Sequence, residues 1–353
     1  MKTLSLITSK RSGEQAIKIL TRLRLLNLDL KIISNEKLQF PLNRPPTEEE
    51  LQTIVCGLPE SKIGEQDFTS KNRIPRSLSE ALKDKLPPHL LKKLPKSMDI
   101  IGSVAIIEVP QELEESKRLV GEAVLKINRN VEVVLGKAGP VAGQIRVRDY
   151  EIVAGSGDTE TTYREFGCIY RLDPTKVYFS PRLSKERMCI AQNVRSSETV
   201  LDMFAGIGPF SILIAKTTRN VSINAVDINP EAVKYLRNNI ILNKVEKRVT
   251  PFLGDVKTIV DLDLKERVDR TIMNLPGHAS EYVSTACQAI KPEGGIINYY
   301  SFQKGTNARE QAVTELGQKI KEAGRDLTEI KASRLVRETA PRVWQVAVDA
   351  TIH

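Results

Sequence analysis

The chain has 353 residues, 41% of them hydrophobic and 27% charged, so it should fold and is long enough for two or three domains. Lysine and arginine number 53 against 44 acidic residues, and a pI near 9.2 favours a polyanionic partner, although a basic enzyme without one is not excluded. The four cysteines lack C-x-x-C spacing and there are three histidines, which excludes a disulfide framework and a structural zinc site.

The first 60 residues predict a small α/β domain. Apolar residues fall on one helical face over 14–26, two short strands are expected over 30–40, and 47–50 has the capping-box pattern that begins a helix. Residues 61–77 are polar and basic among Pro, Gly and Ser, which is typical of a linker. We therefore expect an accessory domain on a basic tether.

Residues 78–180 predict a middle α/β domain. Helices are expected over 78–94, with an interruption at Pro87 and Pro88, and over 112–127; strands are expected over 100–109, 131–135 and 144–153. The last of these strands would place Arg146 and Arg148 on one face. Two arginines so arranged can bind an anion, or they can simply face solvent.

The strand predicted over 199–203 leads into a glycine turn and then a helix. Gly206 and Gly208 let the backbone turn tightly and approach a ligand, while the free N–H groups of the next helix favour a negative group. A dinucleotide fingerprint would need a third glycine where Ser211 stands. Asp202 precedes the turn and could meet a cationic group. This order predicts a nucleotide-cofactor site.

Acidic residues also end the next two strands. The strand over 221–226 ends in Asp227, whose carboxylate could accept both ribose hydroxyls. Asp255 follows the strand over 249–253 and could bond the adenine amino group. The rest of a sheet of about seven strands is expected from strands over 270–273, 295–300, 329–337 and 342–352, with a helix over 307–323.

Two motifs carry a family resemblance. Asp-Met-Phe-Ala-Gly-Ile-Gly at 202–208 resembles the first motif of class I S-adenosylmethionine-dependent methyltransferases. Asn-Leu-Pro at 274–276, Val-Tyr-Phe-Ser-Pro-Arg-Leu at 177–183 and the three-part layout resemble the class I tRNA (guanine-37-N1)-methyltransferases of archaea and eukaryotes over essentially the whole chain. The resemblance implies a Rossmann-like α/β methyltransferase domain over 181–353, preceded by two smaller α/β domains. The second, 78–180, would contribute to the active site. The first, 1–60, could dock on tRNA, since a small domain on a basic tether can reach a part of tRNA distant from the reacting base, or it could be a stabilising or dimerising appendage.

Methylation of guanine N1 needs a general base for the N1 proton and a donor or cation for the charge that develops on O6. The resemblance places the base at Glu186 and the O6 partner at Arg146, and it assigns the edge of the guanine to Asn274. Without the resemblance, Glu186 in the first turn of a helix could simply complement the helix dipole. The tRNA contacts implied are Arg146, Arg148, Arg182 and Pro276. The implied S-adenosylmethionine site comprises Tyr178, Arg182, Asp202, Phe204, Gly206, Gly208, Asp227, Ile228, Asp255, Asn274 and Pro276.

Other nucleic-acid methyltransferases have different sequence patterns. Carbon-5 pyrimidine methyltransferases need a cysteine near the fourth-strand motif, and amino-group enzymes usually show Asn-Pro-Pro-Tyr; neither pattern is present. An aminocarboxypropyl transferase of wybutosine synthesis, or a related bifunctional tRNA methyltransferase, would act at the same tRNA position. The resemblance argues against the aminocarboxypropyl transferase, because that family lacks the Asn-Leu-Pro motif. A non-catalytic tRNA-binding protein is the remaining alternative.

The sequence also predicts where the protein works and with what. The N-terminus lacks a signal peptide and no apolar run approaches the roughly 20 residues of a membrane span, so we expect a cytoplasmic protein without a membrane partner. No motif calls for a metal, and a monomer is expected.

Overall fold

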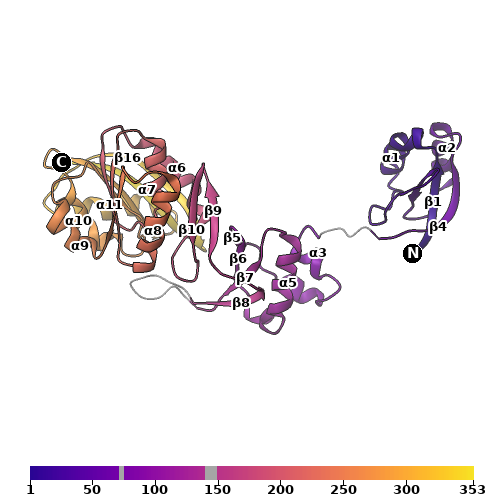
Figure 1. Ribbon diagram of the computed structural model, residues 1–353, viewed down its shortest axis with the longest axis horizontal. Helices are drawn as coiled ribbons and strands as arrows, with labels where there is room; N and C mark the ends of the chain where they lie inside the picture. Colours follow the sequence, from indigo (N-terminus) through magenta and orange to yellow (C-terminus); the bar gives the residue numbers. More distant parts are fainter. Residues whose placement is uncertain (71–74, 140–148) are drawn as a thin grey trace. The chain divides into compact units, whose positions relative to one another are not determined.

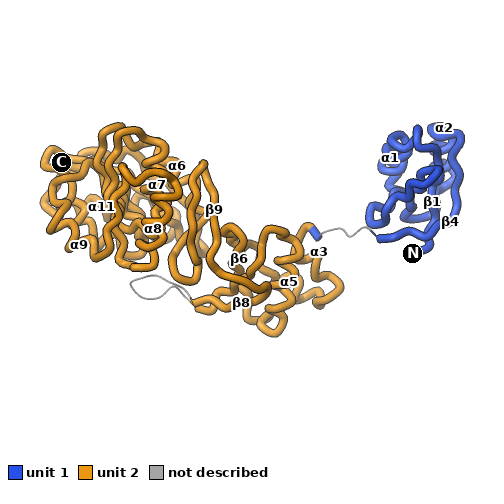
Figure 2. The backbone as a smooth tube through the Cα atoms, viewed as in Figure 1, with its two compact units in different colours: residues 1–75 blue, residues 76–353 orange. Residues whose placement is uncertain are grey.

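The computed structural model describes residues 1–70, 75–139 and 149–353 (Figure 1). The chain divides into two compact units, Met1–Pro75 and Arg76–His353 (Figure 2). Arg146, Arg148 and the first part of the strand expected over 144–153 lie outside the described residues. Buried apolar side chains give each unit its own core.

The first unit is a sheet with two helices packed together. Its described residues form strands in the order β2-β3-β1-β4, which are Ile33–Ser34, Leu38–Pro41, Lys2–Thr8 and Lys62–Asp67. The helical elements are η1 (Lys10–Ser12), α1 (Gly13–Arg22) and α2 (Glu48–Gly57). Helix α2 begins with the expected capping box, in which Thr47 and Glu50 exchange hydrogen bonds.

Strand β4 lies within residues 61–77, which the composition alone indicates as a linker. It pairs antiparallel with β1 from Lys2–Asp67 to Ile7–Lys62. Its side chains are mostly exposed, so its stability comes from backbone pairing rather than from apolar burial. A short, mostly polar edge strand therefore has the same composition as a tether, which is why periodicity does not reveal it.

The second unit begins with a smaller sheet. In its described part the strand order is β5-β6-β7-β8, formed by Asp99–Ile101, Val104–Ile107, Val133–Lys137 and Tyr150–Gly155. The helical elements are α3 (Leu78–Leu82), α4 (Pro88–Leu91), η2 (Gln111–Ser116) and α5 (Lys117–Ile127). The helix expected over 78–94 is two helices because Pro87 and Pro88 interrupt it and Pro88 begins the second.

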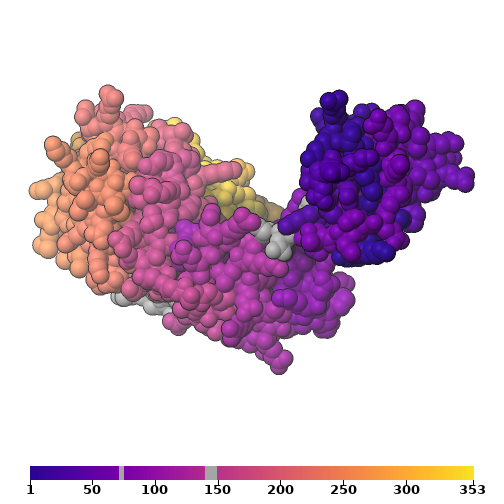
Figure 3. Space-filling model, turned by 45° about the vertical axis from the view of Figure 1, so that its right-hand side comes forward, coloured from indigo at the N-terminus to yellow at the C-terminus, as the bar shows by residue number. Residues whose placement is uncertain are grey.

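A hairpin, β9 (Thr161–Glu165) and β10 (Cys168–Leu172), follows this sheet. Asn239 and Asn243 of α8 (Pro230–Asn243) accept the N–H groups of Arg171 and Ile169 at 2.7 and 2.9 Å, which satisfies the edge of β10. The sequence-based boundary at 180 falls after this hairpin. In Figure 3 the magenta atoms of this region and the orange atoms of the larger sheet form one continuous surface.

The larger sheet is seven-stranded within the described residues, as expected. Its order is β13-β12-β11-β14-β15-β17-β16, formed by Val249–Leu253, Ser222–Asp227, Thr199–Asp202, Arg270–Met273, Gly295–Lys304, Val343–Ile352 and Leu327–Ala340. The strands from β13 to β15 are parallel, and β17 pairs antiparallel with both β15 and β16. This sheet confirms the Rossmann-like α/β class.

Helices cover both faces of the larger sheet (Figure 1). Alternate residues of β11 point to opposite layers, so Val200 joins one core and Leu201 the other. The first layer contains η3 (Pro181–Leu183), α6 (Ser184–Asn193), α7 (Pro209–Thr217) and α8. The second contains α9 (Val256–Ile259), η4 (Val260–Leu264), η5 (Ala279–Tyr282), α10 (Val283–Ala289) and α11 (Ala308–Glu322). Among the described residues, no helix has the length and apolar character needed to cross a membrane.

Candidate functional site

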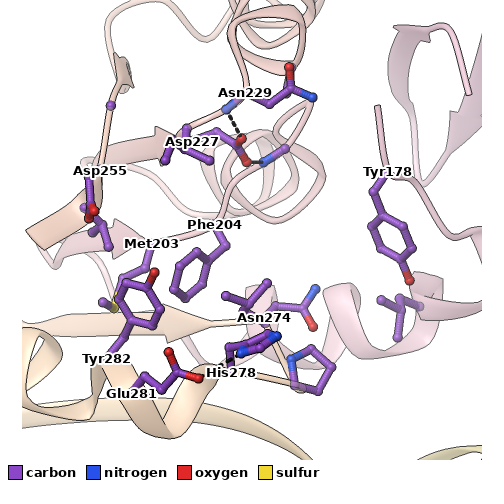
Figure 4. A pocket seen from close by; sticks show the side chains of 18 of the residues that line it. Tyr178, Met203, Phe204, Asp227, Asn229, Asp255, Asn274, His278, Glu281 and Tyr282 are labelled. Carbon is purple, nitrogen blue, oxygen red and sulfur yellow. Dashed lines mark hydrogen bonds and ion pairs between the residues drawn. The ribbon is translucent and has the colours of Figure 1, made fainter. Parts of the chain in front are cut away.

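A cavity of about 620 Å³ lies at the carboxyl edge of the larger sheet, within the range of small-molecule sites (Figure 4). Its floor comes from the ends of β11, β12, β13 and β14, as expected for an open parallel sheet. Among the residues expected to bind cofactor or tRNA, those that line it are Tyr178, Phe204, Gly206, Asp227, Ile228, Asp255, Asn274 and Pro276.

The glycine turn and Asp227 are joined directly. The Asp227 carboxylate accepts the N–H of Gly206 at 2.7 Å and that of Asn229 at 2.8 Å (Figure 4). Gly208 begins α7 with a φ of 89°, and a Cβ there would lie 2.4 Å from the side chain of Leu236. Glycine is therefore required at this position by backbone conformation and by the close approach of α8.

Asp202 lies beneath this turn and is fully buried; it does not line the cavity. Ser211 donates its hydroxyl to one carboxylate oxygen at 2.7 Å, while the other oxygen has no hydrogen-bond partner among the described residues. Burial is the main reason that the pKa of Asp202 rises to about 7. Ser211, which replaces the third glycine of a dinucleotide fingerprint, thus holds the acid that precedes the turn.

One end of the cavity has aromatic and aliphatic walls. Phe204 and Tyr282 meet edge to face with their ring centroids 5.0 Å apart, and Met203 lies beside them (Figure 4). Ile228 also lines the cavity. Asp255 stands at the rim, where one carboxylate oxygen accepts the N–H of Lys257 at 2.9 Å. Apolar walls with a carboxylate at the rim suit the two faces and the amino group of an adenine ring.

The Asn-Leu-Pro turn after β14 forms another part of the cavity wall. Gln345 of β17 donates to the Asn274 side-chain oxygen at 3.4 Å, and the N–H of Phe302 donates to the Pro276 carbonyl at 3.1 Å. Tyr178 lies on the other side of the cavity from Asp255 (Figure 4). The side-chain amide of Asn274 keeps donor capacity for a ligand.

Glu186 lies in the first turn of α6, is 6% exposed and does not line the cavity. One carboxylate oxygen accepts the Tyr300 hydroxyl at 2.7 Å and also an N–H of Arg334, while the other accepts Arg334 Nε at 3.0 Å. Phe302, two residues after Tyr300 on β15, does line the cavity. Because alternate strand residues share a face, Tyr300 and Phe302 lie on the same face of β15, so Glu186 contacts a neighbour of this cavity wall.

The remaining expected residues occupy other places. Arg182 does not line the cavity; its Nε donates to Asp99 of β5 at 2.6 Å. Gly208 is the N-cap residue of α7 and does not line the cavity. Arg146 and Arg148 lie outside the described residues.

Several lining residues are not among the site residues expected from the sequence. His278 and Glu281 form a pair at 2.8 Å just after the Asn-Leu-Pro turn, and Tyr282 follows them. Their position in the segment after a parallel strand is the signal that could have indicated them. Phe302 shares this signal, because it follows the strand expected over 295–300, which is parallel to β14. Gln345 could not be found this way, because it lies on antiparallel β17 and reaches the cavity as the strand partner of Phe302.

The geometry fits a nucleoside cofactor better than a metal. Gly206, with a φ of 56° and no Cβ, opens the turn beside Asp227, and the aromatic walls lie at the next strand end. In the described residues no group of three His, Cys, Asp or Glu side chains is placed to hold a metal ion.

Comparison with known proteins agrees with this arrangement. Residues 161–328 match the TRM5/TYW2 methyltransferase domain, and residues 78–159 match the TYW2 N-terminal domain. The chain is 39% identical to tRNA (guanine(37)-N(1))-methyltransferase Trm5b of Pyrococcus abyssi, covering 82% of this chain and 84% of that protein. It is 33% identical to Trm5b of Methanocaldococcus jannaschii over 99% of both chains.

Solved structures extend the similarity to the whole chain. A complex of aTrm5 with tRNALeu superposes with a TM-score of 0.80 and 32% identity, covering 99% of this chain and 100% of that one. Methanocaldococcus jannaschii TYW2, solved with AdoMet, gives a TM-score of 0.57 at 28% identity, covering 73% and 99%. An aminocarboxypropyltransferase of Pyrococcus horikoshii that acts on 4-demethylwyosine 37 of tRNA(Phe) is 34% identical, covering 78% of this chain and 96% of that protein.

Proposed function

The chain belongs to the TRM5/TYW2 methyltransferase family, and we propose that it is a tRNA (guanine(37)-N1)-methyltransferase that uses S-adenosylmethionine. The observation that carries this assignment is the alignment with a Trm5b protein over 99% of both chains. The alignment with the aminocarboxypropyltransferase covers 96% of that protein but only 78% of this chain. The Asn274 to Pro276 turn in the cavity wall also favours methyl transfer to N1.

We place S-adenosylmethionine in the cavity of the larger sheet. Asp227 would accept the ribose hydroxyls, because each of its oxygens uses one lone pair on a backbone N–H and keeps another. Phe204 and Tyr282 would hold the adenine ring, with Asp255 at its amino group. Fully buried Asp202 would support the turn from below rather than contact the cofactor.

We assign the proton of guanine N1 to Glu186 and the developing charge on O6 to Arg146. When bound, S-adenosylmethionine would supply the methyl group, and its sulfur would keep the electron pair of the bond that breaks. Glu186 would take the N1 proton, so that the freed N1 electron pair could form the bond to the methyl carbon. Asn274, whose amide both donates and accepts, would hold the edge of the base.

The first unit would dock on tRNA away from the reacting base, as a module joined to the catalytic unit by a short segment. Arg148, Arg182 and Pro276 remain candidates for tRNA contacts. We further propose that the protein is a cytoplasmic monomer that needs no metal.

A product analysis tests the assignment. The purified protein is incubated with a tRNA transcript that has guanine at position 37, and with S-adenosylmethionine labelled either in the methyl group or in the aminocarboxypropyl arm. Label from the methyl group alone, in 1-methylguanosine at position 37 by mass spectrometry, is the expected result. A second substrate, tRNA(Phe) with 4-demethylwyosine at position 37, tests the alternative, because label from the arm on that tRNA would indicate the aminocarboxypropyl reaction. Binding of tRNA without product on either substrate would indicate a binding protein. A transcript with adenine at position 37 is the control.

A further inference from the structure

Glu186, Arg334 and Asp349 form a largely buried charge cluster outside the cavity lining. Arg334 of β16 pairs with Glu186 of α6 and, at 2.5 Å, with Asp349 of β17. The side chains of Glu186, Arg334 and Asp349 are 6%, 24% and 10% exposed. Two carboxylates share one guanidinium, so with all three groups charged the cluster has one excess negative charge.

The cluster is fixed from several elements. Tyr300 of β15 donates to Glu186, and Asn298 of the same strand donates to Asp349 at 2.6 Å. Arg270 in turn donates to Asn298 at 3.2 Å and pairs with Glu198, which adds no net charge. Cys189, on the same helix as Glu186, faces the cluster as a thiol whose pKa burial raises, with Arg334 opposing that shift.

Glu186 keeps one position open for a proton. One carboxylate oxygen accepts both Tyr300 and Arg334, but Oε2 accepts only Arg334 Nε within the described residues. A carboxylate oxygen has two lone pairs, so Oε2 retains one. Tyr300 cannot take the proton instead, because burial raises its pKa well above the usual value and its hydroxyl stays protonated.

We propose that Arg334 and Asp349 are positioning residues for Glu186, with Arg334 holding its carboxylate and Asp349 offsetting part of the Arg334 charge so that Glu186 can accept the N1 proton. This inference rests on the proposed function. Arg334 alone would bind the carboxylate so strongly that the carboxylate became a weak base. With Asp349 present, protonation of Glu186 removes the excess negative charge and leaves a neutral Arg334–Asp349 pair, which is favourable in a buried site.

The test is the pH dependence of single-turnover methyl transfer to tRNA by the full-length protein. Asp349→Asn leaves Arg334 to Glu186 alone, so the acid limb of the profile should move down by about one pH unit and the plateau rate should fall about tenfold. Arg334→Met removes the cation, so the acid limb should move up by about one unit. Opposite shifts are the result that a purely structural role would not give.

Tyr300→Phe provides a variant that keeps the ring packed near Phe210, where the two centroids are 6.2 Å apart. It removes one hydrogen bond to the charged carboxylate, so the acid limb should move up by less than in Arg334→Met. If Arg334→Met does not fold, Tyr300→Phe and Asp349→Asn still form a pair of variants for which opposite shifts of the acid limb are expected. Arg334→Lys should restore the wild-type position in part, since it returns the charge without the planar fork.

Asp269→Asn is the matched control. Asp269 precedes β14 at the amino edge of the sheet, where it pairs with Lys291 at 2.6 Å. It should lower stability without moving the profile. Profiles of the cluster variants that coincide with that of the wild type, or that all move in one direction, overturn the inference. A wild-type protein that makes no methylated guanine overturns the proposed function itself, which separates the two failures.

Discussion

The backbone N–H of Gly206 donates to the carboxylate of Asp227 over 2.7 Å, so the acid that ends β12 fixes the glycine turn that follows β11. The two strands are parallel neighbours, and Asn229 donates to the same carboxylate from the start of α8. One side chain therefore organises two loops at the cofactor end of the sheet. A change at Asp227 should therefore act on the turn as well as on the proposed ligand contact.

Asp227→Asn should weaken S-adenosylmethionine binding by about 1 to 3 kcal/mol, because an amide oxygen replaces only one of the two acceptor atoms. Isothermal titration calorimetry measures the affinity, and thermal unfolding without cofactor separates loss of the turn from loss of the ligand contact. Asp255→Asn, at the exposed rim, is the comparison and should have a smaller effect. Unchanged affinity in a folded Asp227→Asn protein would remove Asp227 from the cofactor site.

Asp202 predicts a pH dependence of stability. Burial raises its pKa from 3.8 to about 7, so between these values the native state holds a proton that the unfolded chain has released. The contribution of this bound proton to the stability of the native state is complete below about pH 4, and it is lost as the pH rises through about 7. Asp202→Asn is neutral throughout and retains an oxygen to accept Ser211.

The melting temperature of Asp202→Asn should therefore exceed that of the wild type by roughly 5 °C or more at pH 8, with a smaller gain at pH 5. Differential scanning calorimetry at the two pH values checks this expectation. A gain that is the same at both would mean that the Asp202 carboxyl does not titrate as its burial requires.

Glu186→Gln tests the general base. Glutamine retains partners for Tyr300 and Arg334 but cannot take the N1 proton, so single-turnover methyl transfer should fall by roughly 10²- to 10⁴-fold. Affinities for tRNA and cofactor should barely change, and a higher pH should partly restore the rate. If the carboxylate served only the helix dipole, stability would fall by about 0.3 to 1 kcal/mol and transfer would stay near normal.

Arg146→Ala should slow single-turnover transfer, because the charge that develops on O6 loses its partner. A higher pH should not restore the wild-type rate, in contrast to Glu186→Gln. Arg148→Ala is the matched variant two residues along the chain, and we expect it to weaken tRNA binding more than it slows transfer. If Arg146→Ala and the wild type have equal rates at saturating tRNA, a residue other than Arg146 stabilises the charge on O6.

Removal of residues 1–75, the first compact unit, should weaken tRNA binding and leave S-adenosylmethionine binding unchanged. Filter binding with tRNA at fixed salt and calorimetry with the cofactor measure the two affinities. The matched control is an anticodon stem-loop, which lacks the distant part of tRNA and should bind both proteins equally. Equal affinity of both proteins for whole tRNA would contradict a docking role.

The succession of strands, turns and helices along the chain was sufficient to predict the main features of the larger sheet. Each buried strand is followed by a turn and a helix, and parallel strands bring their carboxyl ends to one edge. Asp227, Asp255 and Asn274 therefore reach one cavity, as expected from their places after three strands. The same reasoning missed β4, because an exposed strand stabilised by backbone pairing leaves no apolar period.

The sequence by itself determined the α/β class, the glycine turn and the family resemblance, because these depend on residues close together in the chain. Only the tertiary structure decided the surroundings of Asp202 and Glu186. Asp202 is buried because α7 covers the end of β11, and Glu186 meets Arg334, 148 residues later, because β16 pairs with β17 through several register shifts. Burial and such long-range pairing determine the electrostatic environment of a carboxylate, and neither can be predicted from the residues that flank it in the sequence.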